Sequence, residues 1–516
     1  MRIGVTSLFS FRPHVEHLAY VTQLLEGAGH ETHALTCDAA FTACYGRLLR
    51  QRTKLSECPR CIIGGVRTFP IARVSAVDSK LHAAIDRDRL RRLATSSVTV
   101  RYRTEAPDFL ESDTFNAAIN DLVIPVETAY ANTMRWIEKN RLDAVVLFNG
   151  RMDVLAGVVA ACEDLKIPFL SLERPWLGHG IAMIPNGNCL DLSELNAMCA
   201  EYARAPLSAS QAKHAGALSA KSFTGGNKLL WRLYNTEPGE TAWPVSGASR
   251  RVLILPSSRN EFEGHPHWTS GWSDYAVAFD DVMDRLSISS ADCVLRCHPS
   301  WKEKMGVNTG WRSEEHYTAW CSHRNIHVIS SANRASTYDL IAAADLIIVN
   351  GSTSGVEAAL RGKQVLLVGH ATYERSDLCS TVSTPKALET LTLPPHQARE
   401  TAVKALRYMY VMANRFPQFV RFVRAISTGH CEYFVGADSD RIVAMLRTGR
   451  VAADDTQIGE NDGVEREVAD ALVRGDWDSL GQPESIGVSA DHVAVERRVG
   501  LRWIDSIRDR LPRGDA

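Results

Sequence analysis

The segment from Ser336 to Gly369, STYDLIAAADLIIVNGSTSGVEAALRGKQVLLVG, decides the fold prediction. It contains an uninterrupted apolar run, Leu346 to Val349, which has the length of a strand. Such runs are typical of parallel strands that helices cover on both faces. Small hydroxyl residues follow the run, and strong helix formers then extend to Gly362. The pattern predicts a helix, a strand, a polar loop, a helix and a second strand.

The polar loop of this segment lies at the predicted carboxyl end of a strand. Ligands bind at this edge of open α/β sheets, and the N–H groups and dipole of a helix N-terminus favour phosphate there. Ser352, Thr353 and Ser354 would add hydroxyl donors, and Glu357, one turn into the helix, is placed to accept hydrogen bonds from a ribose. The spacing of Ser354 and Glu357 fits a capping box equally well, so this segment alone leaves a structural role open.

The totals of the chain limit its class. Its 516 residues are enough for two or three domains. Its 58 Lys and Arg nearly balance its 60 Asp and Glu, so we expect no global field that attracts nucleic acid. No apolar run approaches the ~20 residues that cross a bilayer, and the N-terminal MRIGVTS is typical of a first strand. A cytoplasmic protein, either free or held peripherally at the inner membrane, is expected.

Residues 1–240 predict a Rossmann-like α/β domain with polar residues at two neighbouring strand ends. Asp143 to Phe148 and Ile167 to Leu172 are apolar runs of strand length. The polar residues that follow them are Asn149, Arg151, Glu173 and Arg174. Because parallel strands end at one edge of a sheet, these residues predict one side of a cleft. A simple pairing of Arg151 with Glu173 is the alternative.

Four of the twelve cysteines are grouped in the first domain. Without a secretion signal, cysteines are more often thiols or metal ligands than disulfides. The four have the spacing C-x6-C-x13-C-x2-C and are Cys37, Cys44, Cys58 and Cys61. The C-x2-C pair is typical of a tetrahedral site, so we predict a structural zinc or iron–sulfur site that staples a long excursion of the chain. Four reduced thiols behind a strand are the alternative.

The second half of the chain predicts another doubly wound parallel sheet. Residues 236–249 are rich in Pro, Gly and small polar residues and predict a linker. Alternating strands and helices then return, which predicts a second Rossmann-like domain over residues 250–440. Residues 441–516 are predicted as an acidic, mobile linker followed by a terminal amphipathic helix from Val493 to Leu511.

A second strand-end loop precedes the hydroxyl loop in this predicted domain. The strand from Asp292 to Cys297 ends at His298 and Pro299, and the proline ends the strand and restricts the direction of the imidazole. Arg296 and His298 are therefore predicted to lie opposite the hydroxyl loop and to clamp a phosphate with it. Two parallel sheets that face each other across a cleft form the GT-B architecture of glycosyltransferases.

The segment from Arg296 to about Tyr373 resembles a known group of enzymes. Its RCHP motif and the hydroxyl-loop segment are similar to bacterial capsule and surface-polysaccharide glycosyltransferases, which include the Kdo transferases of capsule export. They also resemble the His-Pro and Ser/Thr motifs with which bacterial sialyltransferases hold a CMP-sugar. The FNGR at 148–151, the LER at 172–174 and the grouped cysteines give a fainter match over the first half of the chain.

The resemblance implies a role for each motif residue. His298 would contact the donor phosphate or base, Ser352 and Thr353 the phosphate, and Glu357 the ribose. The donor would be a nucleotide sugar, with a CMP-sugar favoured over UDP or GDP sugars, and the acceptor a glycan or lipid-linked glycan of a capsule, a lipopolysaccharide or a related polymer. Cys297 departs from the family, whose loop usually has a proline there, and this leaves the loop shape open.

The expected reaction is glycosyl transfer. The donor phosphate leaves, stabilised by the helix N-terminus and His298, while an acceptor hydroxyl attacks the anomeric carbon. In an inverting enzyme Glu173, or less favourably His14 after the first strand, would take the acceptor proton. A retaining enzyme needs no such base. A sugar-nucleotide epimerase on the same architecture and a non-catalytic assembly subunit are the alternatives at this point.

Overall fold

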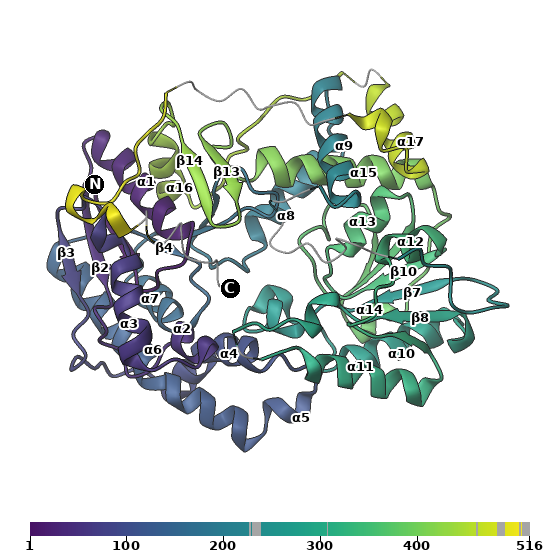
Figure 1. Ribbon diagram of the computed structural model, residues 1–516, viewed down its shortest axis with the longest axis horizontal. Helices are drawn as coiled ribbons and strands as arrows, with labels where there is room; N and C mark the ends of the chain where they lie inside the picture. Colours follow the sequence, from purple (N-terminus) through teal and green to yellow (C-terminus); the bar gives the residue numbers. More distant parts are fainter. Residues whose placement is uncertain are drawn as a thin grey trace.

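The computed structural model describes residues 1–226, 229, 239–306, 308–460, 463–481, 491–504 and 507. Two six-stranded sheets organise it, and Figure 1 shows the first on the left and the second on the right. Helix α15 lies near the top of this view, and helix α4 lies in its lower half, above α5. The predicted α/β class with two Rossmann-like domains is confirmed.

The first sheet has the strand order β3-β2-β1-β4-β5-β6, and only β6 is antiparallel to its neighbour. Its apolar strand residues, such as Val5 and Val146, are completely buried, as expected for strands covered on both faces. The strands are β1 (Arg2–Ser7), β2 (Glu31–Thr36), β3 (Val74–Ala76), β4 (Ala144–Phe148), β5 (Phe169–Glu173) and β6 (Ala182–Pro185). The helices of this part are α1 (His14–Gly27), α2 (Tyr45–Arg50), α3 (Lys54–Gly64), α4 (Arg87–Tyr102), α5 (Pro107–Leu110), α6 (Asp113–Asn140) and α7 (Asp153–Asp164).

The second sheet is parallel throughout and has the order β12-β11-β10-β7-β8-β9. All four residues of β10 are buried, which explains their continuous apolar sequence. The strands are β7 (Val252–Leu255), β8 (Cys293–Arg296), β9 (His327–Ile329), β10 (Leu346–Val349), β11 (Gln364–Val368) and β12 (Ser380–Val382). The helices are α10 (Tyr275–Arg285), α11 (Trp311–Arg324), α12 (Thr337–Ala343), α13 (Ser354–Leu360), α14 (Pro385–Leu388) and α15 (Ala398–Tyr410).

The chain crosses between the two halves more often than the predicted division at 240 and 441 implies. Helices α8 (Ser193–Tyr202) and α9 (Ala209–Phe223) precede the predicted linker but share a hydrophobic core with the second sheet. Conversely, the hairpin of β13 (Val423–Ser427) and β14 (His430–Tyr433) and helix α16 (Asp440–Thr448) pack into the core of the first sheet. Each domain therefore has a hydrophobic core that includes side chains from the other half of the chain.

The C-terminal segment differs from its prediction. The acidic segment contains helix α17 (Val464–Arg474), whose Val468 and Leu472 are buried in the core of the second sheet. Residues 493–498 of the predicted terminal helix are not helical, and a short 3-10 turn, Val499–Leu501, follows them. Arg498 holds this segment to the first domain by donating to the carbonyls of Phe69 and Ile71. Trp503, Ile504 and Ile507 are helical, in agreement with the prediction. Residues 505, 506 and 508–511 of the predicted helix and residues 236–238 of the predicted linker lie outside the described residues.

The carboxyl edges of the two sheets face one another. Arg151 follows β4, and its guanidinium donates to the carbonyls of Asn260 at 2.6 Å and Glu261 at 2.9 Å, in the loop after β7. Arg103, at the end of α4, is buried and donates to the carbonyl of Ser300, just after β8, at 3.0 Å. Two parallel-sheet domains with facing carboxyl edges constitute the predicted GT-B architecture.

Glu105 is a buried carboxyl group at this junction, and we predict that it makes the free energy of unfolding depend on pH. Its carboxylate accepts the Arg259 N–H at 3.0 Å and the Ser313 hydroxyl at 2.6 Å, while burial raises its pKa to about 7. Because the folded state then holds a proton that the unfolded state releases above the ordinary Glu pKa, this carboxyl destabilises the fold as pH rises toward 7. In Glu105→Gln, we expect the free energy of unfolding relative to wild type to rise with pH over this range, by at most about 1.4 kcal/mol per pH unit. Urea titrations from pH 5 to 8 measure it, and a pH-independent difference would contradict the assignment.

Candidate active site

His298 and Arg296 take different positions at the end of β8. His298 is half-buried, and its Nδ1 accepts the Ser300 N–H at 3.1 Å, so the neutral ring carries its proton on Nε2. Burial is the main cause that lowers the His298 pKa, while the Glu261 carboxylate opposes it. Arg296 is buried and donates to the carbonyls of Ser330 and Asn333, the latter at 3.0 Å. Arg296 therefore braces the loop after β9, and the donor-binding role predicted for it is left to His298.

The hydroxyl loop follows β10 as predicted. Ser352 is buried, its Oγ accepts the Ser354 N–H at 3.2 Å, and its carbonyl accepts the Tyr373 hydroxyl at 2.7 Å. Thr353 is exposed, and its side chain makes no capping hydrogen bond to α13. Ser352 therefore shapes the loop from inside, whereas Thr353 is placed on its outer face.

Glu357 lies one turn into α13 and is not part of a backbone capping box. Its carboxylate accepts the Tyr338 hydroxyl at 3.1 Å and a hydrogen bond from the side chain of Ser354. Burial raises the pKa of Glu357 to about 7. A half-buried carboxyl with this pKa can both donate and accept hydrogen bonds near neutral pH.

The loop after β7 connects these two strand ends and was not singled out by the sequence. The Ser257 N–H donates to the side-chain oxygen of Asn350 at 2.6 Å, and the Ser257 hydroxyl donates to the Glu261 carboxylate at 3.0 Å. Glu261 is exposed and acts electrostatically on His298. Since β7 lies between β8 and β10, its loop places Glu261 between the two predicted halves of the donor site. The paired serines after an apolar strand, Ser257 and Ser258, were the available signal.

Glu173 and His14 form a pair at the carboxyl edge of the first sheet. The Glu173 carboxylate lies 3.3 Å from His14 Nε2 and accepts the Asn149 amide at 2.8 Å and the Arg174 N–H at 3.0 Å. Burial raises the Glu173 pKa, and burial, with the Arg174 charge, lowers the His14 pKa to about 3. His14 is therefore neutral and buried, and Glu173 is the stronger base.

Arg151 and Arg174 lie beside this pair but have structural partners. The Arg151 guanidinium bridges to the loop after β7, while its backbone N–H donates to the Asn149 side-chain oxygen at 3.0 Å. Arg174 donates to the carbonyl of Leu229 at 2.8 Å. The predicted alternative, a direct pairing of Arg151 with Glu173, is not among the ion pairs of the described residues.

A continuous polar path joins the two sheet edges through these contacts. His14 contacts Glu173, Glu173 contacts Asn149, and Asn149 holds the backbone of Arg151. Arg151 then reaches the backbone of Glu261, whose carboxylate acts on His298. The residues predicted on separate domains are thereby placed around one junction.

Aromatic rings surround the Glu173–His14 pair on the side of the first domain. The His14 ring stacks on Phe148 with 3.9 Å between centroids, and Phe11 lies 6.1 Å from Phe148 and 6.3 Å from Tyr45. Phe11, Tyr45 and Phe148 are half-buried, so part of each ring remains accessible. Such rings present apolar faces of the kind on which sugars stack.

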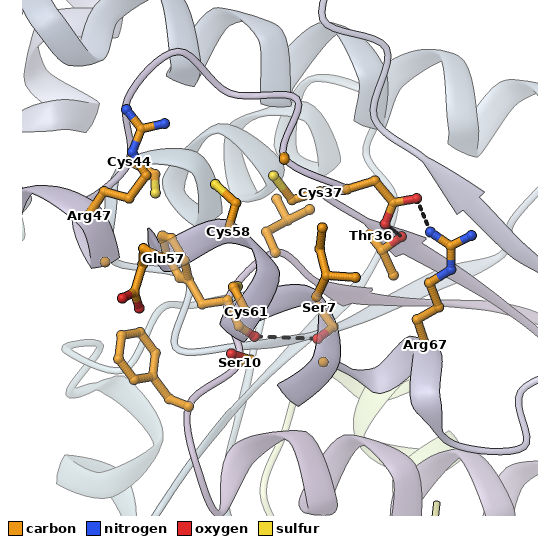
Figure 2. A pocket seen from close by; sticks show the side chains of 18 of the residues that line it. Ser7, Ser10, Thr36, Cys37, Cys44, Arg47, Glu57, Cys58, Cys61 and Arg67 are labelled. Carbon is orange, nitrogen blue, oxygen red and sulfur yellow. Dashed lines mark hydrogen bonds and ion pairs between the residues drawn. The ribbon is translucent and has the colours of Figure 1, made fainter. Parts of the chain in front are cut away.

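The four grouped cysteines do not form the predicted metal site. They line a cavity of about 50 Å³, and Figure 2 shows their side chains spread along its wall. Among the described residues, the His, Cys, Asp and Glu groups that converge within ligating distance do not include any three of these cysteines. Cys58 and Cys61 lie within helix α3, which continues through Pro59, instead of in a turn. The residues present do not fit zinc or an iron–sulfur cluster, and the alternative of packed thiols fits better.

No protein-family model and no curated protein sequence matches this chain. Solved structures match it weakly. Thermosulfurimonas dismutans KpsC, a β-Kdo 2,4 transferase, matches at 13% identity over 64% of this chain and 87% of its own, with a TM-score of 0.33. Acinetobacter baumannii MurG matches at 13% identity over 87% of this chain and 99% of its own, with a TM-score of 0.27. Methanocaldococcus jannaschii UDP-GlcNAc 2-epimerase, solved with UDP-GlcNAc and UDP, matches at 10% identity over 87% and 99%, with a TM-score of 0.26. At these identities and TM-scores the matches do not indicate the activity of this chain.

Proposed function

We propose that this protein is a glycosyltransferase that moves a sugar from a nucleotide-sugar donor to a surface-glycan acceptor. The observation that supports it best is the junction between the two sheet edges. The carboxylate of Glu173, in contact with His14, lies on one edge, and His298 lies on the edge that faces it. Glycosyl transfer needs a base on the acceptor side and hydrogen-bond donors on the leaving phosphate. The two sheet edges supply these separately.

The donor would bind at the carboxyl edge of the second sheet. The neutral His298 offers its Nε2–H, and Thr353 offers an exposed hydroxyl to a phosphate oxygen. Asn350, Ser257 and Glu261 hold the two loops in register. The carboxylate of the exposed Glu261 would repel phosphate charge at close range. This favours a CMP-sugar, whose phosphodiester carries one negative charge, over UDP and GDP sugars, whose diphosphate carries two; these are the alternatives.

The acceptor would bind at the edge of the first sheet. Half-buried Phe11, Tyr45 and Phe148 provide stacking faces next to His14. Glu173, held by Asn149 and the Arg174 N–H, would take the proton of the attacking hydroxyl in an inverting reaction. His14 acts here as a positioning residue because its neutral ring contacts the carboxylate and its pKa is too low for a base near pH 7.

Glu357 gives a prediction for the donor side. In Glu357→Ala, the Tyr338 hydroxyl loses its carboxylate partner and the proposed ribose contact disappears, so we expect donor affinity to fall by roughly 10-fold, the loss of one charge-assisted hydrogen bond. Isothermal calorimetry with the nucleotide that binds wild type measures it. The matched control is Asp292→Ala, which removes a carboxylate that accepts the Ser249 hydroxyl at 2.8 Å at the opposite, amino end of β8. Equal affinity of Glu357→Ala and wild type would remove Glu357 from the site.

The activity assay separates the three functions that the sequence leaves open. The full chain is incubated with CMP-, UDP- and GDP-sugars, with and without capsule or lipopolysaccharide fragments as acceptors. Nucleotide release that requires the acceptor supports transfer. Conversion of the donor without any acceptor would instead show an epimerase, and binding without turnover an assembly subunit.

Placement in the cell is part of the same proposal. In the portion of the chain that the structure describes, every helix is either too short or too polar to traverse a bilayer. We propose that the protein works in the cytoplasm, peripherally at the inner membrane, where lipid-linked acceptors are built.

A further inference from the structure

A group of ligating side chains lies outside the residues used above. Asp191, His265 and His267 each offer one ligand atom, and these atoms lie within 4.8 Å of one another. Asp191 precedes α8, and the two histidines flank Pro266 in the long loop between β7 and α10. Two imidazoles and one carboxylate are a common ligand set for Zn²⁺ and related divalent ions.

The spacing within the group suits a tetrahedral ion. Asp191 Oδ1 and His267 Nδ1 are 3.4 Å apart. Ligand atoms 2.0–2.1 Å from a tetrahedral Zn²⁺ are about 3.3 Å from each other, by the geometry of the tetrahedron. The two imidazole rings have their centroids 4.7 Å apart at 71°, so they approach edge to face and do not stack against each other. Since the three ligand atoms lie within 4.8 Å of one another, an ion between them would draw them closer together.

The Nδ1 atoms of both rings have backbone hydrogen bonds that a bound ion would replace. His267 Nδ1 accepts the Leu192 N–H at 3.1 Å, and His265 Nδ1 accepts the His267 N–H at 3.2 Å. Each Nδ1 therefore has the lone pair that a ligand atom needs, and an ion bound there would displace the backbone N–H from it.

The group lies where the two domains meet. The segment that carries Asp191 is tied to the first sheet, because the Cys189 N–H donates to the Asn149 carbonyl at 2.8 Å. The loop that carries the histidines belongs to the second domain, and its Trp268 indole N–H donates to the Leu190 carbonyl at 2.8 Å. An ion bound by Asp191 and both histidines would join these two segments.

We propose that Asp191, His265 and His267 bind one Zn²⁺ ion that joins the loop after β7 to the segment before α8. Three protein ligands leave a tetrahedral ion one position for water or a substrate oxygen. The competing explanation is a plain His267–Asp191 ion pair, in which the Asp191 carboxylate only caps the Ser193 N–H at 2.8 Å. This inference does not depend on glycosyl transfer.

The test is metal binding to the full-length chain. Protein stripped with a chelator is titrated with ZnCl₂ by calorimetry, and Co²⁺ is used as the optical probe. We expect one tight site in wild type, with affinity reduced at least about 10-fold in Asp191→Asn and in His265→Gln/His267→Gln, since even outer-shell changes cost 10–100-fold. His316→Gln is the matched control, because it breaks another His–Asp pair, 3.0 Å from Asp274, and should leave affinity unchanged.

The grouped cysteines are the main rival binders, and the Co²⁺ spectrum identifies them. A nitrogen and oxygen site gives visible d–d bands without thiolate charge transfer, whereas cysteine ligands add it. We expect no charge-transfer band and normal binding in Cys58→Ser/Cys61→Ser. Loss of binding in that variant, a charge-transfer band, or wild-type affinity in His265→Gln/His267→Gln would overturn the proposal. Circular dichroism of each metal-free variant confirms that it is folded.

Discussion

Glu173→Gln is expected to lower the transfer rate by about 10²- to 10⁴-fold, the range in which general bases contribute. The substitution keeps the Asn149 contact but removes the carboxylate that would accept the proton of the acceptor. Donor affinity should be unchanged, because Glu173 belongs to the first sheet and the donor would bind at the second. Steady-state kinetics with donor and acceptor varied separately measure kcat and both KM values.

The pH dependence of the transfer rate tests the role of Glu173 independently. Burial raises the Glu173 pKa, so the carboxylate form that acts as base forms at higher pH than for an ordinary glutamate. The wild-type rate should therefore rise as pH rises through that raised pKa, and this limb should vanish in Glu173→Gln. Glu127→Gln is the matched control, because Glu127 also pairs with a histidine, His82 at 3.1 Å, away from the junction. Equal losses in both variants would show a general destabilisation.

Arg151→Ala is expected to destabilise the chain by about 3 kcal/mol and to uncouple the two sheet edges. The buried guanidinium donates to the carbonyls of Asn260 and Glu261, and to the Ser96 hydroxyl. Removing it leaves buried acceptors without donors, at about 1–3 kcal/mol for each. Urea denaturation followed by fluorescence measures the free energy of unfolding.

The control for Arg151 is an arginine whose ion pair is exposed. Arg135 lies 3.3 Å from Asp78 on the surface, and Arg135→Ala should leave the free energy of unfolding unchanged within error. Arg151→Ala should also lose transfer activity under conditions in which it remains folded, because its guanidinium holds the backbone of Asn260 and Glu261 against the first domain. Wild-type stability of Arg151→Ala would contradict its role as the bridge.

The sheets could be predicted because their strands carry an unambiguous pattern. Leu346 to Val349 is apolar at every position, and all four residues are buried in a strand that is paired on both sides. The crossings between domains were not predictable in this way. Helices α8 and α9 and the hairpin of β13 and β14 have ordinary amphipathic patterns, which state that a face is buried but not against which sheet.

The site could be predicted only at the strand ends. Glu173 and Asn149 were chosen because they follow predicted buried strands, and the structure brings them together. Arg296 is the last residue of β8, yet its side chain donates to the loop after β9. The pairing of Glu173 with His14 could not be read from residues 159 positions apart in the chain. Glu261 was missed because it lies inside an irregular loop without periodicity.

The cysteine prediction was wrong because spacing alone does not determine backbone conformation. The C-x2-C pair is part of helix α3, which continues through Pro59, and both cysteines line the cavity without a third ligand in reach among the described residues. The acidic segment also contains a helix, α17, that its composition did not predict. Its low overall hydrophobicity hid the repeat of Val464, Val468 and Leu472, which forms the buried face of α17.

The central claim is that a nucleotide sugar binds at the carboxyl edge of the second sheet, opposite the base of the first. Calorimetry with CMP, UDP, GDP and ADP on wild type, His298→Ala and Glu173→Gln tests it most directly. We predict one nucleotide bound per chain, affinity lowered by at least about 10-fold in His298→Ala through the lost donor, and unchanged affinity in Glu173→Gln. No binding of any of the four nucleotides, or equal affinity in wild type and His298→Ala, would contradict the claim.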